Sequence, residues 1–186
     1  SGLVERIGEE TGAITHKHGE ERTEITEPVP DHGFGLSEAL RLFEEQGPSL
    51  ADAHIVAVGH RVVQGGRYFS GPALIDDDVV ARIEQLVPLG PLHNPAHLKG
   101  IEVGRRLLSD VPHVAVFDTA FFQDLPEEAA RYALDREVAD TYSIRRYGAH
   151  GTSHQFVSGA VSQLLGRDDL KQVVLHLGNG ASASAV

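Results

Sequence analysis

The chain contains neither cysteine nor methionine among its 186 residues. Without cysteine it can form no disulfide and no thiolate site. It also lacks an apolar run long enough to cross a bilayer, and it shows no signal-peptide pattern. Positive charge is scarce, since 16 Lys and Arg face 27 Asp and Glu, and the formal charge of −11 repels nucleic acid and anionic lipid over most of the surface. We therefore expect a cytoplasmic protein that binds neither nucleic acid nor membrane, and in which any anion site is local.

The hydrophobic pattern indicates an α/β protein. Three short β-type runs separated by glycines, Leu3–Ile7, Ala13–His18 and Thr23–Thr26, predict a small meander. Farther along, the patterns predict helices over Leu36–Glu45 (with Ser37 as a possible start), Asp77–Leu86, Pro95–Leu108 and Ser153–Leu165, and strands over Ile55–Val58, Val114–Phe117 and Gln172–Leu177. Because these strands and helices alternate, we expect a largely parallel sheet covered by helices.

Five polar segments lie at strand exits or helix starts, where α/β sheets collect their ligands. They are GHRVVQGG at 59–66, PLHNPAH at 91–97, DTAFF at 118–122, RRYGAHGTSH at 145–154 and HLGNG at 176–180. In the second segment, Asn94 is expected to be the N-cap of the helix that Pro95 begins.

The HLGNG segment has the sequence of a tight turn. Asn179-Gly180 is the preferred dipeptide of a type I′ hairpin, and the alternating small residues after it are typical of a second strand. Gly178 and Gly180 would also let main-chain N–H groups approach a phosphate closely. An ordinary hairpin explains the segment equally well, and neither the dinucleotide fingerprint nor the P-loop pattern is present.

The RRYGAHGTSH segment is compatible with a metal site, a nucleophilic triad or an anion site. Thr152 begins a capping-box pattern that places the helix start at about Ser153 and leaves His150 outside the helix. That position disfavours zinc binding by His150 and His154, which also lack the glutamate of the H-E-x-x-H motif. A helix N-terminus near Arg145-Arg146 favours phosphate oxygens, although the two arginines could equally pair with surface acids.

Two further side chains suit charged ligands. Asp118 ends a strand of buried character, where a carboxylate needs a cation, a metal ion or hydrogen bonds, and Mg²⁺ is the natural partner beside phosphate-binding loops. Arg61 carries a planar fork that matches a carboxylate or a phosphate.

Taken together, the five segments occur in the order and approximate spacing of the acetate kinases, which belong to the superfamily of sugar kinases, heat-shock ATPases and actin, and the chain resembles that family over nearly its whole length. The resemblance implies a ribonuclease-H-like α/β fold (actin-like ATPase superfamily) with a mixed sheet and an inserted helical region. It also implies reversible phosphoryl transfer between ATP and acetate, which yields acetyl phosphate and ADP.

The resemblance further implies roles for individual residues. Arg61 would hold the acetate carboxylate or the acyl phosphate, Asp118 would position Mg²⁺ (or Mn²⁺), and His150 would contact the transferring phosphoryl group. The walls of the methyl pocket would be Val63 and Leu92, and the nucleotide phosphates would lie against His176, Gly178, Asn179 and Gly180. Acetate kinases form homodimers, so the complete protein is expected to do so, while this chain alone is expected to be mostly monomeric.

The chain also departs from the family pattern. Gln64 and Phe122 stand where histidines are usual, and Ala149 stands where many relatives carry phenylalanine, which would enlarge the acyl pocket toward propionate. We expect residues 1–186 to be an amino-terminal acetate kinase domain without its first strand pair and without the carboxyl-terminal nucleotide-binding domain. Such a chain would be inactive alone, and a non-catalytic module that binds anions or a partner is the alternative.

Overall fold

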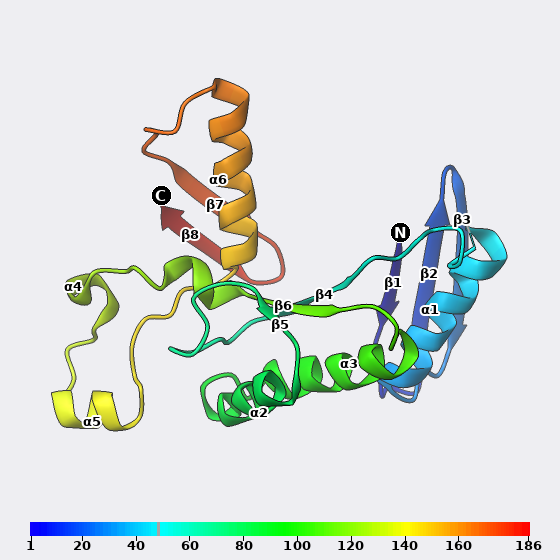
Figure 1. The fold of residues 1–186 in the computed structure, drawn as a ribbon, viewed down its shortest axis with the longest axis horizontal. Coiled ribbons are helices and arrows are strands. Elements are labelled where there is room, and N and C mark those ends of the chain that lie inside the picture. Colours follow the sequence, from blue (N-terminus) through cyan, green and yellow to red (C-terminus); the bar gives the residue numbers. More distant parts are fainter. Residues whose placement is uncertain (48) are drawn as a thin grey trace. The chain divides into compact units, whose positions relative to one another are not determined.

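The computed structural model describes residues 1–47 and 49–186, and these form two compact units. The first unit comprises Ser1–His60 and Ala96–Val114, and the second comprises Arg61–Pro95 and Ala115–Val186. The strands β4 (Val58–Val62) and β6 (His113–Phe117) and the helix α3 (Asn94–Leu107) run from one unit into the other (Figure 1). No described helix is both long enough and apolar enough to pass through a membrane.

The first unit is built on the expected meander. Its strands are β1 (Gly2–Glu5), β2 (Gly12–His18) and β3 (Glu21–Glu27), paired antiparallel in the order β1-β2-β3. Helix α1 (His32–Gln46) packs on β1 and β2. The buried centre is Ile14, Val29 and Leu42, so the alternating side chains of the meander and one face of α1 make a small core of their own.

Helix α1 begins earlier than its apolar pattern predicts. Its N-cap is Asp31, whose Oδ1 accepts a hydrogen bond from Phe34 N at 2.8 Å, and Ser37 lies inside the helix. The predicted start was wrong because two glycines, Gly33 and Gly35, occupy the first turn and hide its helical pattern, while a capping carboxylate satisfies the free backbone N–H groups there.

The second unit contains the remaining elements. They are β5 (Ala73–Leu74), α2 (Asp77–Gln85), η1 (Val87–Leu89), η2 (Asp118–Phe122), α4 (Glu127–Ala130), α5 (Arg136–Thr141), α6 (Gly151–Leu165), β7 (Val173–Leu177) and β8 (Ala181–Ala185). Strands β4, β6 and β5 form a three-stranded sheet in the order β4-β6-β5, whereas β7 and β8 form an antiparallel pair. Strand β4 was predicted too early, since Ile55–Val58 overlaps it at Val58 alone.

The predicted hairpin is present, but its turn differs from the expected type. Leu177 pairs with Ala181, so the loop has three residues, Gly178–Gly180, closed by a hydrogen bond of 3.1 Å from Gly178 N to Gly180 O. Neither Asn179 nor Gly180 has a positive φ angle, which a type I′ turn requires at both central positions. The type I′ prediction was therefore wrong, although the strand reversal itself was right.

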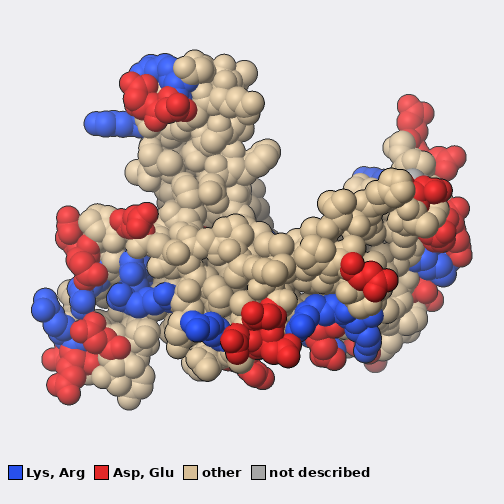
Figure 2. Space-filling model, viewed as in Figure 1, with Lys and Arg blue, Asp and Glu red and all other residues tan. Residues whose placement is uncertain are grey.

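Helix α6 packs against β7 and against η2. One face of β7 stays open, because Val173, Leu175 and Leu177 are all exposed whereas Val174 between them is buried. Figure 2 shows the visible face around α6 as largely uncharged, with acidic and basic side chains gathered at the far end of this helix and over α2, α4 and α5.

Candidate active site

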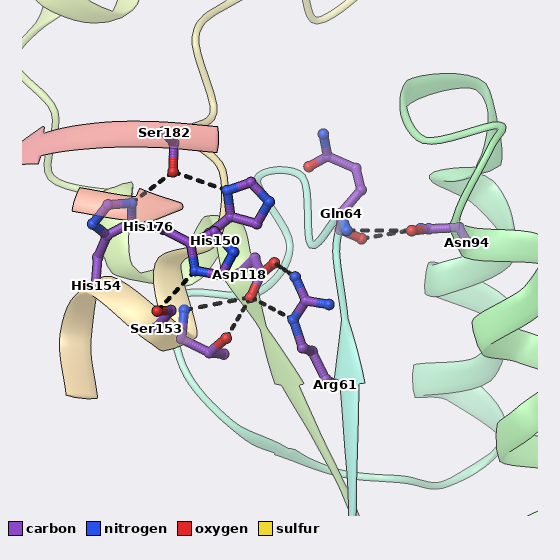
Figure 3. A network of polar contacts seen from close by, with 10 residues as sticks. Arg61, Gln64, Asn94, Asp118, His150, Ser153, His154, His176 and Ser182 are labelled. Carbon is purple, nitrogen blue, oxygen red and sulfur yellow. Dashed lines mark hydrogen bonds and ion pairs between the residues drawn. The ribbon is translucent and has the colours of Figure 1, made fainter. Parts of the chain in front are cut away.

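Asp118 is the centre of a polar cluster in the second unit (Figure 3). It follows β6 directly and begins η2, and its side chain is buried. Arg61, on β4, donates from Nε to Oδ1 at 3.2 Å and from Nη2 to Oδ2 at 2.5 Å. Thr152, in the first turn of α6, donates to Oδ1 from its hydroxyl at 2.6 Å and from its backbone N–H at 3.4 Å. Four donated hydrogen bonds and one cation thus compensate for the loss of hydration of this carboxylate.

The two members of this ion pair differ in their access to solvent. The side chain of Asp118 is 1 % exposed, whereas that of Arg61 is 51 % exposed. Because the bidentate contact uses only one edge of the guanidinium, the other edge keeps N–H donors for a ligand. That Arg61 binds a ligand anion stays a prediction, and the structure shows its guanidinium paired with Asp118 and half exposed to solvent.

The start of α6 does not follow the predicted capping box. Its N-cap is His150, in the left-handed conformation (φ 55°, ψ 31°), and no side chain caps the helix. The hydroxyl of Thr152 binds Asp118 instead, and Ser153 Oγ lies 3.0 Å from Nδ1 of His176 on β7. The capping hydroxyls expected from the sequence are therefore used to join α6 to its neighbours in the site.

Gly151 allows α6 to begin directly against η2. A Cβ atom placed on this residue would lie 1.8 Å from the backbone oxygen of Asp118. The neighbouring His150 holds a left-handed conformation, which costs about 1 kcal/mol or more for a residue other than glycine. Strain of this kind persists where surrounding contacts fix the chain, and it is concentrated at functional sites.

Three histidines lie beside the Asp118 cluster. Nδ1 of His150 is 2.8 Å from Ser182 Oγ, and Nε2 of His154 is 2.7 Å from the same oxygen. The second nitrogen of His154, Nδ1, is 2.8 Å from Ser184 Oγ. The rings of His150 and His176 stack with their centroids 4.0 Å apart.

Desolvation favours the uncharged form of two of these imidazoles, because it lowers their pKa. Desolvation is the main cause that lowers the pKa of His150, followed by the proximity of His176, while the Asp118 carboxylate acts in the opposite direction. The pKa of His154 is lowered by desolvation and then by His176. Both rings are therefore neutral at pH 7 and above, and each has one N–H donor and one acceptor nitrogen.

The glycine loop lies next to these rings. A Cβ on Gly180 would be 3.3 Å from Cε1 and Nε2 of His150, and one on Gly178 would be 3.2 Å from Nε2 of His176. Asn179 lies between the two glycines, so the predicted nucleotide-side residues come together with His150. Of the two predicted pocket walls, Val63 is partly buried, whereas Leu92 is 86 % exposed.

Arg145 and Arg146 are directed to other partners. Arg145 donates to the Arg146 carbonyl and lies over the Tyr147 ring. Arg146 donates to the Ala129 carbonyl at 2.8 Å and lies over the ring of Tyr132. The expectation that the pair contributes charge to a phosphate site at the start of α6 is therefore not supported by these contacts.

Asn94 was expected to cap α3, but its side chain binds the backbone of Gln64 instead. Its buried side chain accepts from Gln64 N at 3.2 Å and donates to Gln64 O at 3.1 Å. Gln64 in turn accepts from Gly66 N at 2.8 Å. Asn94 is the first residue of the helix and not its cap, and its amide fixes the loop that follows the end of β4 at Val62.

The described residues contain no group of three or more His, Asp or Glu side chains that could hold a metal ion. Asp118 contributes one buried carboxylate that is already paired with Arg61. Mg²⁺ usually keeps several water ligands and takes one or two carboxylates together with substrate phosphates. The donor set therefore fits an ion carried mainly by phosphates and waters, with at most one contribution from Asp118.

Five residues of the cluster were not selected from the sequence as site residues: Thr152, Ser153, His154, Ser182 and Ser184. The alternation of serine and alanine at 181–185 was a usable signal, because residues two apart on a strand point to the same face. The spacing of His150 and His154 in the sequence is that of a possible zinc pair, which the predicted helix start disfavours. Both imidazoles do converge, but on a serine hydroxyl.

The family model of the acetokinase family matches residues 1–186. The chain is 55 % identical to the acetate kinase of Corynebacterium aurimucosum over 188 residues and 56 % identical to that of Clavibacter michiganensis over 188 residues. These alignments cover all of this chain but 46 % and 48 % of the relatives, so the chain spans about half of their length.

Two solved structures are similar in fold. A propionate kinase from Francisella tularensis superposes with a TM-score of 0.90 at 40 % identity, covering 100 % of this chain and 47 % of that one. The acetate kinase of Porphyromonas gingivalis gives 0.90 at 38 % identity, covering 98 % and 47 %. These similarities confirm the expected α/β fold class and the resemblance found in the five segments, and we conclude that the chain belongs to the acetokinase family.

Proposed function

We propose that the full-length protein transfers a phosphoryl group reversibly between ATP and acetate, giving acetyl phosphate and ADP. The observation that supports this most is the cluster of Arg61, Asp118 and His150, in which a half-exposed guanidinium lies near a neutral imidazole and a glycine loop. Family membership and the names of the relatives agree with this chemistry.

The cluster suits a nucleophile that needs no deprotonation. Acetate titrates near pH 4, as carboxyl groups do, and it is ionised at neutral pH. The one carboxylate of the cluster, Asp118, is occupied by Arg61 and Thr152, so it holds the arginine and does not act as a general base. Catalysis in this proposal comes from alignment of the reactants and neutralisation of charge, as in phosphoryl transfer generally.

The proposal also assigns a task to each of the other predicted residues, and a second one to Asp118. Arg61 binds the carboxylate through its free edge, and His150 donates to the transferring phosphoryl group. The phosphates of the nucleotide lie along His176, Gly178, Asn179 and Gly180, and Val63 and Leu92 contact the methyl group. Mg²⁺, when bound with ATP, neutralises phosphate charge, and Asp118 is the proposed contact for it in this chain. The cytoplasmic location, the homodimer and the extent of the domain over residues 1–186 stay predictions.

The experiment is to trap acyl phosphate as a hydroxamate after incubating the full-length protein with acetate and Mg-ATP. Arg61→Ala and Asp118→Ala should each lower turnover by about a hundredfold or more, because both remove charge complementarity from the transition state. Arg41→Ala is a matched control, since Arg41 also binds carboxylates but lies in an exposed helical ion pair. Parental turnover in Arg61→Ala and Asp118→Ala would refute the mechanism.

Propionate is the second candidate substrate. One similar structure is a propionate kinase, and Ala149 stands where the resemblance to acetate kinases implies phenylalanine in many relatives, which would leave more room in the acyl pocket. One methylene in an apolar pocket changes specificity by roughly 10- to 200-fold. The ratio of kcat/KM for the two acids decides between them, and Ala149→Phe should shift this ratio toward acetate.

A further inference from the structure

The hydroxyl of Ser182 connects the imidazole of His150, which is partly buried, with that of His154, which is fully buried. It lies 2.8 Å from Nδ1 of His150 and 2.7 Å from Nε2 of His154, and Figure 3 shows it between the two rings. Ser184, two residues along β8 and on the same face, reaches the other nitrogen of His154 at 2.8 Å. Three hydrogen bonds thus run in series from Ser184 through His154 and Ser182 to His150.

The proton count makes this series directional. A hydroxyl has one proton, and a neutral imidazole has one N–H and one acceptor nitrogen. If Ser182 donates to His150, then His154 must donate from Nε2 to Ser182 and accept at Nδ1 from Ser184. In the other arrangements His150 carries its proton on Nδ1 and donates to Ser182, which then either donates to His154 or accepts from both rings. The free nitrogen of His150, Nε2, is a donor in the first arrangement and an acceptor in the others.

We propose that Ser182 is a positioning residue that donates to Nδ1 of His150, holds the proton of this ring on Nε2, and so gives the site an uncharged N–H donor for a phosphoryl oxygen. The proposal rests on the function proposed above and specifies how its histidine works. Gly180 has no side chain, and a Cβ there would lie 3.3 Å from Nε2 of His150, so the glycine leaves this nitrogen accessible from the loop side. A lone pair on Nε2 would repel phosphoryl oxygens, whereas an N–H attracts them.

A neutral donor also suits the surroundings of His150. The ring stacks on His176 with 4.0 Å between centroids and feels the positive charge of Arg61. A second cation there would meet repulsion from the guanidinium and would have to be desolvated. A donor fixed by tautomer supplies the hydrogen bond without adding that charge, and it persists at alkaline pH, where an imidazolium would not.

The first test is direct observation of the tautomer in the full-length protein labelled with ¹⁵N-histidine. At pH 8 the parent should show His150 with an unprotonated Nδ1 and a protonated Nε2. In Ser182→Ala both resonances should move, because Nδ1 loses its donor, and in Ser182→Thr, which keeps a hydroxyl, they should stay near the parental positions. A parental His150 that is protonated on Nδ1 would overturn the proposal.

The second test is kinetic and uses the hydroxamate assay. Ser182→Ala should lower kcat by about tenfold or more while KM for acetate and ATP changes by less than about threefold, because the hydrogen bond is used by the transferring group. Ser182→Thr should recover most of the loss. Ser158→Ala is the matched control, since the hydroxyl of this buried serine donates within its own helix, to Gln155 O at 3.1 Å, and its kcat should stay near the parental value.

The outcomes separate this proposal from the function on which it rests. Parental kcat in Ser182→Ala would overturn the positioning role even if Arg61→Ala is inactive. If the parent protein makes no acetyl phosphate, the proposed function fails, and the NMR measurement still decides the tautomer. The urea midpoint of each variant shows whether a lower kcat reflects partial unfolding. If Ser182→Ala is partly unfolded, its histidine resonances, recorded without urea on the folded fraction, decide whether Ser182 sets the tautomer of His150.

Discussion

Gly151→Ala tests the contact on which the whole cluster depends. A Cβ at this position would lie 1.8 Å from the Asp118 backbone oxygen, whereas real Cβ atoms essentially never come within 3.0 Å of a neighbour. The start of α6 must therefore retreat from η2 by at least about 1.2 Å, and a misplacement of about 1 Å can cost a hundredfold in rate. The same shift stretches the 2.6 Å hydrogen bond from Thr152 to Asp118 and moves His150.

We expect Gly151→Ala to lower kcat of acetyl phosphate formation by about a hundredfold and to destabilise the fold by roughly 1–3 kcal/mol, as overpacking does. Hydroxamate trapping measures the first quantity and urea unfolding the second. Gly159→Ala is the control on the same helix, because its added Cβ would meet nothing within 4 Å beyond the helix's own nearby backbone, and alanine should stabilise the helix by about 0.5–1 kcal/mol. Parental kcat and stability in Gly151→Ala would refute the reasoning, since the contact could then be relieved without moving the site.

Three further predictions concern other parts of the chain. Asn94→Ala should cost about 2–3 kcal/mol in urea unfolding, because it leaves the buried N–H and carbonyl of Gln64 without their partner, and a loss under 0.5 kcal/mol would show that water replaces the amide. The urea midpoint should be constant above pH 6.5 and fall as the pH drops below it. Burial lowers the pKa of His60, His150 and His154 in the folded state, so the unfolded state binds more protons at these residues below pH 6.5. A midpoint that stays constant from pH 8 to pH 5 would contradict this. Leu92→Ala should leave stability unchanged within about 0.5 kcal/mol, because the side chain is exposed, and a raised KM for acetate would support its place in the methyl pocket.

Elements with a clear period were predictable from the sequence. The meander, α2, α3, β6, α6 and β7 lie within two residues of their predicted bounds, because apolar spacing or a turn residue marks each of them. The start of α1 and the position of β4 were missed, since the first turn of α1 contains two glycines and β4 begins only at Val58, where the chain already carries polar residues. Tertiary contacts decide such positions, and local patterns do not report them.

The charged residues and the glycines of the candidate site could be predicted from the sequence, because each stands out by its own residue type. Arg61 and Asp118 were selected separately from strand exits, and the structure joins them in one ion pair. The hydroxyls could not be assigned, because Thr152 and Ser153 match a local capping pattern equally well whether they cap a helix or contact residues far along the chain. The local sequence favours hydrogen bonds from these hydroxyls to the backbone at the helix start, whereas the fold brings Asp118 and His176 within reach of them.

Because Arg61 is exposed and Asp118 is buried, the electrostatic potential at the mouth of the site is positive, whereas the net charge of the chain is negative. An ion approaching from solvent meets the arginine, while the aspartate lies behind it, so the local field is attractive to anions within a chain of formal charge −11. Dissolved salt then acts in two opposite ways on the approach of a small anion, because it weakens repulsion from the distant acidic surface and attraction by the near guanidinium. At separations beyond the Debye length, about 10 Å at 0.1 M salt, the repulsion fades first. Moderate salt should therefore speed the encounter with small carboxylates before higher salt slows it.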